Sequence, residues 1–169
     1  PIVAIYMPRP RKVNTRKVRE RILILCEGAK TEPNYFKAIK DDKRLEDKLT
    51  ALRIEVYDTI YNTALELVKQ AVMLKKEAWY QHNSYDSIWV VVDRDGYGKH
   101  PEAFALAKKH HINITFSSIS FEYWFLLHFV KINVAFERSK EAEDYLRQHD
   151  YYRGYGKAHR HYNKLRPLT

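Results

Sequence analysis

The chain has 169 residues, of which 45% are hydrophobic and 30% charged, so one folded globular domain is expected and a disordered chain is excluded. Its single cysteine, Cys26, excludes an internal disulfide framework and a cysteine-based zinc cage. No apolar run approaches the roughly 20 residues that a membrane helix needs, and no signal peptide is visible. We therefore expect a cytoplasmic protein that makes no contact with a membrane.

The formal net charge of +9 is concentrated at the two ends of the chain. Residues 1–21 hold seven basic side chains and one acidic one, residues 151–169 hold five basic ones and no acid, and the body between them is slightly acidic. Basic ends favour a polyanion such as nucleic acid, because binding releases the counterions of its phosphates. The alternative is that they are solvated termini that only aid solubility. The candidate nucleic-acid contacts are Arg9, Arg11, Lys12, Arg16, Lys17, Arg153, Lys157 and Arg160.

Hydrophobic patterns along the chain predict alternating strands and helices. Continuous apolar runs predict strands covered on both faces over 21–26 and 86–92, and an alternating run predicts a half-exposed edge strand over 52–58. A short fourth strand is expected over 113–117. Helical spacing and capping signals predict helices over 31–40, 63–80, 101–110, 121–129 and 139–149.

This order predicts an α/β fold with a mostly parallel four-stranded sheet, helices on both faces and right-handed crossovers. Thr31 and Thr63 are the expected N-caps of the first two helices, and the helix over 121–129, which is apolar nearly all round, is expected to be buried. The expected organisation is a basic N-terminal arm (1–20), an α/β domain (21–150) and a basic, aromatic C-terminal tail (151–169).

Acidic residues follow both of the buried strands. Glu27 comes directly after the first strand, and Asp93 and Asp95 come at the end of the third. Ligands of parallel sheets bind at the carboxyl ends of the strands, so these acids meet at one edge if the first and third strands are neighbours. Residues two apart project on the same side, so Asp93 and Asp95 can address one hard cation, Mg²⁺ or Mn²⁺. Glu27 is then a further ligand or a general acid or base.

Each of these acids also has a structural interpretation. The aspartates form a loop pair if one caps a turn and the other pairs with Arg94 or Lys99. Glu27 is a structural residue if it pairs with Lys30 or with an arginine of the arm. The residues alone leave both interpretations open.

Glu122 is a further candidate, because it follows the fourth strand and so faces the same edge of the sheet. Its neighbours in sequence are aromatic or aliphatic, and an idle carboxylate among them would be poorly solvated. The alternative is an acid placed in the first turn of a helix only because the helix dipole favours it there.

A Gly-Tyr-Gly-Lys sequence occurs at 96–99 and again at 154–157. Neither copy is a P-loop, because the G-x-x-x-x-G-K-[S/T] spacing is absent. Lys99 could contact a phosphate beside an acidic metal site, whereas a coincidental turn sequence is the alternative. Aromatic and basic residues also alternate over 151–164, which suits stacking on bases or, alternatively, a segment that packs over the sheet edge.

Three motifs follow one another along the chain. They are Leu25-Cys26-Glu27-Gly28-x-x-Thr31-Glu32-Pro33-x-Tyr35-Phe36, Val92-Asp93-Arg94-Asp95, and Ser117-x-x-x-Phe121-Glu122-x-Trp124-x-Leu126-Leu127-His128-Phe129. Together they resemble the RloB/AbiLii-like family, over roughly residues 20–165. This family consists of bacterial proteins associated with restriction loci and abortive phage infection, and it looks related to the Toprim domain.

The resemblance implies a Toprim-type parallel sheet. In Toprim enzymes the glutamate serves as acid, base or ligand, and the aspartate pair holds Mg²⁺. Those roles carry over to Glu27, Asp93 and Asp95, and the Phe-Glu-x-Trp motif makes Glu122 a further candidate.

The chain departs from the family at 118–120, where the family often has Asn-Pro-Cys and this chain has Ser-Ile-Ser. It also stops soon after the second Gly-Tyr-Gly-Lys sequence, where further helix is expected. We therefore expect a truncated C-terminal lobe.

The expected function is a Mg²⁺-dependent nuclease that hydrolyses phosphodiester bonds of RNA or DNA as an effector of bacterial phage defence. The expected catalytic residues are Glu27, Glu122, Lys30 and Lys99, and the expected metal ligands are Glu27, Asp93, Asp95 and Glu122. The expected partners are nucleic acid and a companion ATPase or other defence-system protein, and a dimer is one option for the assembly.

Two alternatives belong to other classes. One is a non-catalytic Toprim-like module that binds nucleic acid or regulates a partner. The other is a primase-like nucleotidyl transferase, which ranks third because no zinc ribbon or helicase partner is visible in the sequence.

Overall fold

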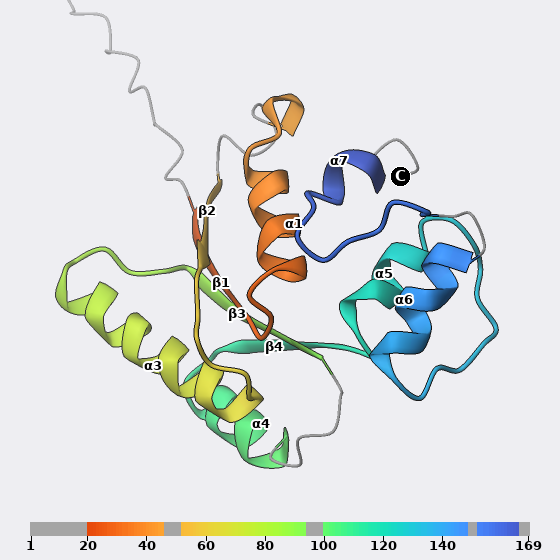
Figure 1. Cartoon of the computed structure of the whole chain (residues 1–169). Coiled ribbons are helices and arrows are strands. Elements are labelled where there is room, and N and C mark those ends of the chain that lie inside the picture. The colour runs from red at the N-terminus through yellow and green to blue at the C-terminus, as the bar shows by residue number, and fades with distance from the viewer. Residues whose placement is uncertain (1–19, 46–51, 94–99, 149–151, 166–169) are drawn as a thin grey trace, which may run out of the picture.

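The computed structural model describes residues 20–45, 52–93, 100–148 and 152–165, in which strands and helices alternate (Figure 1). None of the helices in these ranges is long and apolar enough to cross a membrane. The strands are β1 (Glu20–Cys26), β2 (Leu52–Tyr57), β3 (Ser87–Asp93) and β4 (Asn113–Ser117). The helices are α1 (Thr31–Lys40), α3 (Ala64–Tyr80), α4 (His100–Lys109), α5 (Phe121–Leu126), α6 (Ser139–Gln148) and α7 (Tyr162–Leu165), with a short 3₁₀ helix over Lys43–Leu45.

The four strands form one parallel sheet in the order β2-β1-β3-β4, which confirms the predicted α/β fold. The first and third strands are neighbours, with Cys26 opposite Val91. Strand β4 follows on the other side of β3, with Ser117 opposite Asp93. The alternating strand β2 lies at an edge of the sheet, as predicted.

The strand order reverses between β1 and β3. From β1 the chain passes through α1 to β2 on one side of the sheet, and from β3 it passes through α4 to β4 on the other side. In open α/β sheets a crevice forms outside the carboxyl ends of the strands at such a switch point, and ligands bind there. The fold therefore places the ends of β1 and β3, and the acids that follow or finish them, at the expected binding position.

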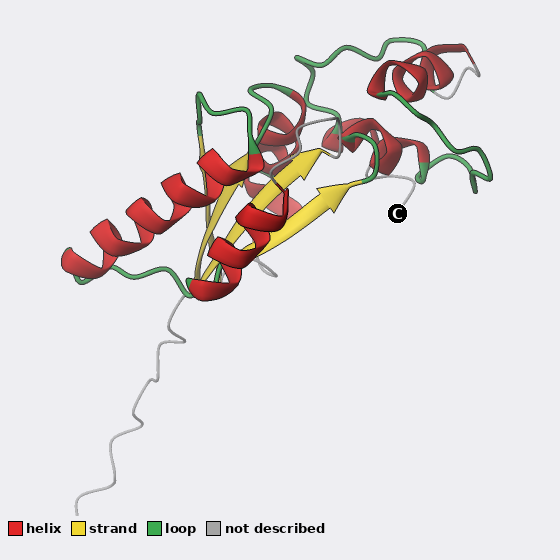
Figure 2. Cartoon of the chain, turned by 90° about the horizontal axis from the view of Figure 1, so that it is seen from below, coloured by secondary structure: helices red, strands yellow, loops and turns green. Residues whose placement is uncertain are grey.

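Helices cover both faces of the sheet (Figures 1 and 2). Leu23 and Leu25 of β1 belong to the core beneath α3 and α4, and Ile24 and Cys26 belong to the core beneath α1, α5 and α6. Successive side chains of a strand point to opposite faces, so a continuous apolar run supplies both cores. This is why the run that contains no polar alternation forms the central strand.

The capping signals are partly confirmed. Thr63 is the N-cap of α3, and its hydroxyl accepts a hydrogen bond from the Glu66 amide (3.4 Å) and donates one to the Glu66 carboxylate (2.8 Å). Thr31, in contrast, is the first helical residue of α1, and Lys30 is the N-cap. The buried Thr31 side chain hydrogen-bonds with Tyr155, so its hydroxyl serves a contact between segments instead of the helix terminus.

Helix α5 differs most from its prediction. It ends at Leu126 instead of 129, because the amides of His128 and Phe129 bond to carbonyls three residues back and tighten the chain into a turn. The helix is also not buried all round, since Trp124 is 45% exposed and Leu127, its C-cap, is 47% exposed. The side chains of this exposed face line a pocket, which is described below.

The described C-terminal segment, residues 152–165, packs against the domain. Tyr152, Tyr155, His161 and Leu165 are buried, and the tyrosines and Leu165 belong to the core shared with α1 and α5. Of the two interpretations of these aromatic residues, packing is the one that the structure shows. Rings inside the core cannot stack on bases, so Tyr152 and Tyr155 are not available for such contacts.

Candidate active site

Glu27 and Asp93 meet at the switch point of the sheet. The Glu27 amide donates a hydrogen bond of 2.9 Å to the Val91 carbonyl, which extends the pairing of β1 with β3 by one residue. The Glu27 carboxylate accepts a hydrogen bond of 2.9 Å at Oε2 from the Asp93 amide. Both side chains are partly buried. The parallel pairing of two strands with acids at their ends thus brings these acids together.

Glu32, a third acid at this edge, was not identified as a site residue from the sequence. It is 4% exposed, and its carboxylate lies so close to Gly28 that a β-carbon there would clash with Oε2 and would lie 3.1 Å from Cδ. Gly28 therefore leaves room for the close approach of this side chain, which would have to shift if a β-carbon were present. Glu32 stands only five residues after Glu27 in the sequence. An acid in the first turn of a helix, however, is already explained by the helix dipole, so its position alone did not indicate a site.

Charged groups at this edge affect the pKa of the Cys26 thiol. Burial raises its pKa well above the usual value, and the negative charges of Glu32 and Asp93 raise it further, against an opposing effect of Lys37. A thiol in such surroundings stays protonated and unreactive. Glu32 and Asp93 therefore place negative charge near the Cys26 side chain.

Glu122 lies in a different polar cluster. It is 2% exposed, it accepts a hydrogen bond from the Tyr155 hydroxyl, and the Lys157 ammonium lies 4.0 Å from its Oε1. Burial and then the charge of Glu122 raise the pKa of Tyr155, so this phenol remains a hydrogen-bond donor. The C-terminal segment thus supplies the hydrogen bond and the positive charge that a buried carboxylate needs.

Lys157 connects this cluster with the first one. Its ammonium pairs with Glu143 at 2.9 Å. Burial alone would lower the pKa of Lys157, but the hydrogen bond to Glu143 and the charges of Glu122, Glu143 and Glu32 outweigh burial and raise it. Lys157 is therefore charged at neutral pH and within electrostatic reach of Glu32.

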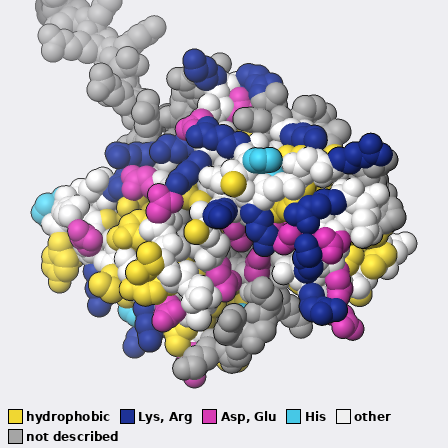
Figure 3. Space-filling view, in the orientation of Figure 1, with side chains coloured by type: hydrophobic (Ala, Val, Ile, Leu, Met, Phe, Trp, Pro, Cys, Tyr) yellow, Lys and Arg dark blue, Asp and Glu magenta, His cyan; other side chains and the backbone are white. Residues whose placement is uncertain are grey.

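Some of the predicted basic contacts are exposed in the described ranges. Lys30 is exposed at the N-cap of α1, three residues after Glu27. Arg153 is exposed, and Arg160 is exposed and pairs with Asp41 at 3.0 Å. Figure 3 shows Lys and Arg side chains gathered over the upper part of this face, around α1 and the C-terminal segment. The predicted site residues outside the described ranges are Arg9, Arg11, Lys12, Arg16, Lys17, Asp95 and Lys99.

The donor atoms at the switch point suit a hard divalent cation. Mg²⁺ and Mn²⁺ prefer carboxylate oxygens, and Mg²⁺ commonly takes one or two protein carboxylates together with water and substrate phosphate. Among the described residues, no three His, Cys, Asp or Glu side chains are arranged to hold an ion. Glu27 and Asp93 offer carboxylate oxygens of the kind that such a cation prefers, and Asp95 lies outside the described residues.

The order of these residues along the chain matches a family of proteins. The family model described as RloB-like protein matches residues 22–167, a range that includes Glu27, Asp93 and Glu122. No curated protein sequence matches the chain.

Proposed function

The chain belongs to the RloB-like protein family, and on this premise we propose that it is a divalent-metal-dependent nuclease that hydrolyses phosphodiester bonds of nucleic acid. The observation that carries the proposal is the contact between Glu27 and the Asp93 amide. It sets one acid at each of the two strand ends that flank the switch point, where ligands of such sheets bind. Membership of the family supports a role as an effector of phage defence, together with a companion ATPase or other defence-system protein.

In this proposal Asp93 and Asp95 hold Mg²⁺ or Mn²⁺. When bound, the ion lowers the pKa of a water molecule and neutralises charge on the phosphate. Glu27 is oriented by its hydrogen bond from the Asp93 amide, and it accepts the proton of the attacking water. Lys30, exposed at the start of α1, and Lys99 stabilise the charge that develops on the phosphate.

Glu122 has a structural role in this proposal. Its carboxylate is buried and already has partners in Tyr155 and Lys157. It therefore anchors the C-terminal segment beside the active edge of the sheet, and a second ion is not assigned to it.

A cleavage assay tests the proposal. Labelled tRNA, single-stranded RNA, single-stranded DNA and duplex DNA are incubated with the protein in Mg²⁺, Mn²⁺ or EDTA, beside the Glu27→Gln and Asp93→Asn variants. Glu77→Gln is the matched control, because Glu77 is an exposed acid of α3 on the opposite face of the sheet. We expect cleavage of at least one substrate by the wild type and the control in Mg²⁺ or Mn²⁺ only. Cleavage that persists in EDTA, or in both site variants, would show that cleavage does not depend on the proposed metal site.

A non-catalytic module that binds nucleic acid is the second candidate. It is favoured by the finding that no three metal-donor side chains converge among the described residues. Nucleic-acid binding without cleavage of any of the four substrates, equal in wild type and Asp93→Asn, would select it.

A further inference from the structure

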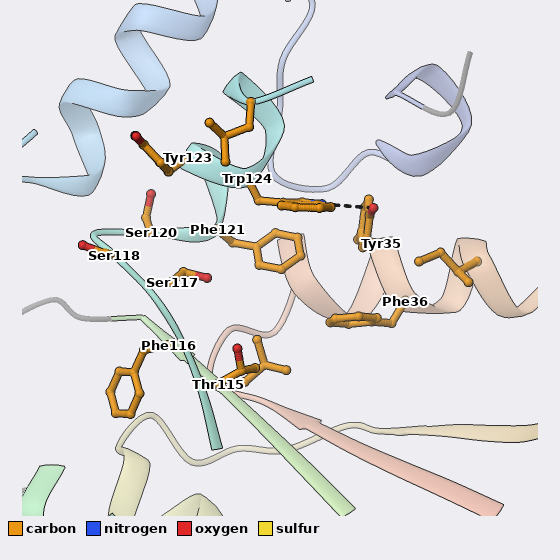
Figure 4. A pocket seen from close by; sticks show the side chains of 13 residues that line it. Tyr35, Phe36, Thr115, Phe116, Ser117, Ser118, Ser120, Phe121, Tyr123 and Trp124 are labelled. Carbon is orange, nitrogen blue, oxygen red and sulfur yellow. Dashed lines mark hydrogen bonds between the residues drawn. The ribbon is translucent and has the colours of Figure 1, made fainter. Parts of the chain in front are cut away.

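A pocket of about 580 Å³ opens on the face of the sheet covered by α1 and α5. Its volume lies in the range of small-molecule sites, which is about 300–1,000 Å³. Its floor includes Val91 of β3 and Thr115 of β4, and its walls come from α1, α5 and the loop between β4 and α5 (Figure 4).

The pocket adjoins the candidate active site. Val91 lines it, and Asp93 lies two residues further along the same face of β3, a distance of about 7 Å at the usual rise of a strand. Ser117, which also lines the pocket, is paired in register with Asp93. The pocket and the position of Asp93 are thus neighbours on one face of the sheet.

Aromatic side chains form the walls of the pocket. Trp124 of α5 and Phe36 of α1 lie on opposite sides in Figure 4, with Phe121 between them. The Trp124 indole donates a hydrogen bond of 3.0 Å to the Tyr35 hydroxyl, which fixes the orientation of its ring. The hydrogen bond holds the ring in place. Because Trp124 is also 45% exposed, a planar ligand can still reach the ring.

Short polar residues complete the lining of the pocket. Ser117, Ser118 and Ser120 of the loop between β4 and α5 line the pocket together with Thr115. Ser120 is fully buried, and its hydroxyl has no hydrogen-bond partner among the residues that the structure describes. A buried hydroxyl without a partner costs free energy, so its presence in a pocket wall favours a ligand with polar atoms on its edge.

We propose that this pocket binds one unstacked base of a single-stranded nucleic acid, at a nucleotide next to the phosphate held at Asp93. The inference rests on the proposed function and specifies its substrate as single-stranded or locally unpaired. A base combines a flat apolar face, which suits Trp124 and Phe36, with polar edge atoms, which suit the serine hydroxyls. The net charge of +9 favours the polyanionic backbone that would deliver such a base.

Equilibrium binding tests this inference without any cleavage. A short labelled single-stranded oligonucleotide, an abasic strand of the same length and the matching duplex are titrated in EDTA and followed by fluorescence anisotropy. The proteins are wild type, Trp124→Ala, Trp124→Phe and the matched control Trp79→Ala, whose indole is 65% exposed on the helix of the opposite face.

Loss of one stacked base weakens binding by roughly 5- to 150-fold. We expect a loss of this size for the single strand in Trp124→Ala, little loss in Trp124→Phe or Trp79→Ala, and equally weak binding of the abasic strand by all four proteins. Equal affinity of the wild type for the base-bearing and abasic strands, or an equal loss in Trp124→Ala and Trp79→Ala, would overturn the base pocket.

A second measurement keeps the test valid if Trp124→Ala does not fold. In a Trp79→Phe, Trp89→Phe variant, Trp124 is the remaining indole, because the chain has three tryptophans. Its fluorescence should be quenched by the single strand and unchanged by the abasic strand, and the same response to both would contradict the inference. Base-dependent binding without cleavage in any metal would overturn only the nuclease proposal.

Discussion

Two groups of acidic side chains differ in their surroundings. Glu27 and Asp93 are partly exposed, and a backbone amide orients the Glu27 carboxylate. Glu122 and Glu143 are buried, and the C-terminal segment provides them with Lys157 and provides Glu122 with a phenolic hydroxyl. The first group follows central strands, and the second lies on helices next to the sheet.

In our proposal this difference separates acids that take part in chemistry from acids that stabilise the fold. A backbone amide orients a carboxylate without cancelling its charge, whereas an ammonium group cancels it. Glu122 thus has a positively charged neighbour in Lys157, and in our proposal Glu27 and Asp93 face an external cation. Substitutions in the first group should reduce activity and leave the fold intact, and substitutions in the second should first reduce stability.

The largest expected effect is on catalysis. Asp93→Asn and Glu27→Gln should each lower kcat/KM for the cleaved substrate about 100-fold or more, a loss of about 2.7 kcal/mol of transition-state stabilisation. Each variant should keep the urea unfolding midpoint of the wild type, because the exchanged groups are partly exposed. A parallel fall in unfolding midpoint and activity would show that these acids are structural too.

The second expected effect is on stability. Tyr155→Phe removes the hydroxyl that donates to the buried Glu122, and an unsatisfied buried acceptor costs about 1–3 kcal/mol of unfolding free energy. Urea denaturation measures this loss, with Tyr80→Phe as the control, because Tyr80 is 74% exposed. Equal unfolding free energies for the two variants would show that the hydrogen bond from Tyr155 to Glu122 does not stabilise the fold.

A smaller effect is expected at Gly28. In Gly28→Ala the new β-carbon overlaps the Glu32 carboxylate, which must shift, so we expect a loss of about 1 kcal/mol of unfolding free energy and a partial loss of cleavage. Gly154→Ala is the matched control, because its β-carbon would meet no atom within 4 Å. A neutral Gly28→Ala would show that Glu32 moves freely and does not shape the site.

The smallest effect is a pH dependence of stability. Burial lowers the pKa of His161 from its usual 6.5, so between that lowered value and pH 6.5 the unfolded chain binds more protons than the folded one. Stability should therefore fall as the pH drops below 6.5. In unfolding scans from pH 7 to 5.5, His161→Gln should flatten this slope and the exposed His159→Gln should not. An identical slope in both variants would show that the pH dependence of stability does not come from His161.

The meeting of Glu27 and Asp93 at one edge of the sheet could be predicted because its signals are local. The runs that end at Glu27 and Asp93 are too apolar for strands with a solvated face, and parallel pairing of such strands brings their carboxyl ends together. Glu32 could not be distinguished in this way, since an acid in the first turn of a helix is common for another reason.

The partners of Glu122 could not be predicted, because the contact with Tyr155 joins residues 33 apart through a segment without periodic pattern. Alternating aromatic and basic residues do not reveal which side chains turn inward. For α5, the apolar sequence indicated burial on all sides, but the pocket beside it leaves Trp124 accessible. Hydrophobic pattern predicts which residues avoid water, and it does not predict where the packing leaves a cavity.

Mn²⁺ binding, followed by the electron paramagnetic resonance signal of the free ion, tests the central assignment most directly. The account predicts that wild type and Glu122→Gln, both measured while folded, bind Mn²⁺ with similar affinity. It also predicts that Asp93→Asn and Glu27→Gln each bind Mn²⁺ about 10-fold more weakly or worse. Unchanged Mn²⁺ affinity in Asp93→Asn and Glu27→Gln, or a loss confined to Glu122→Gln, would contradict the assignment of the metal site to the switch point.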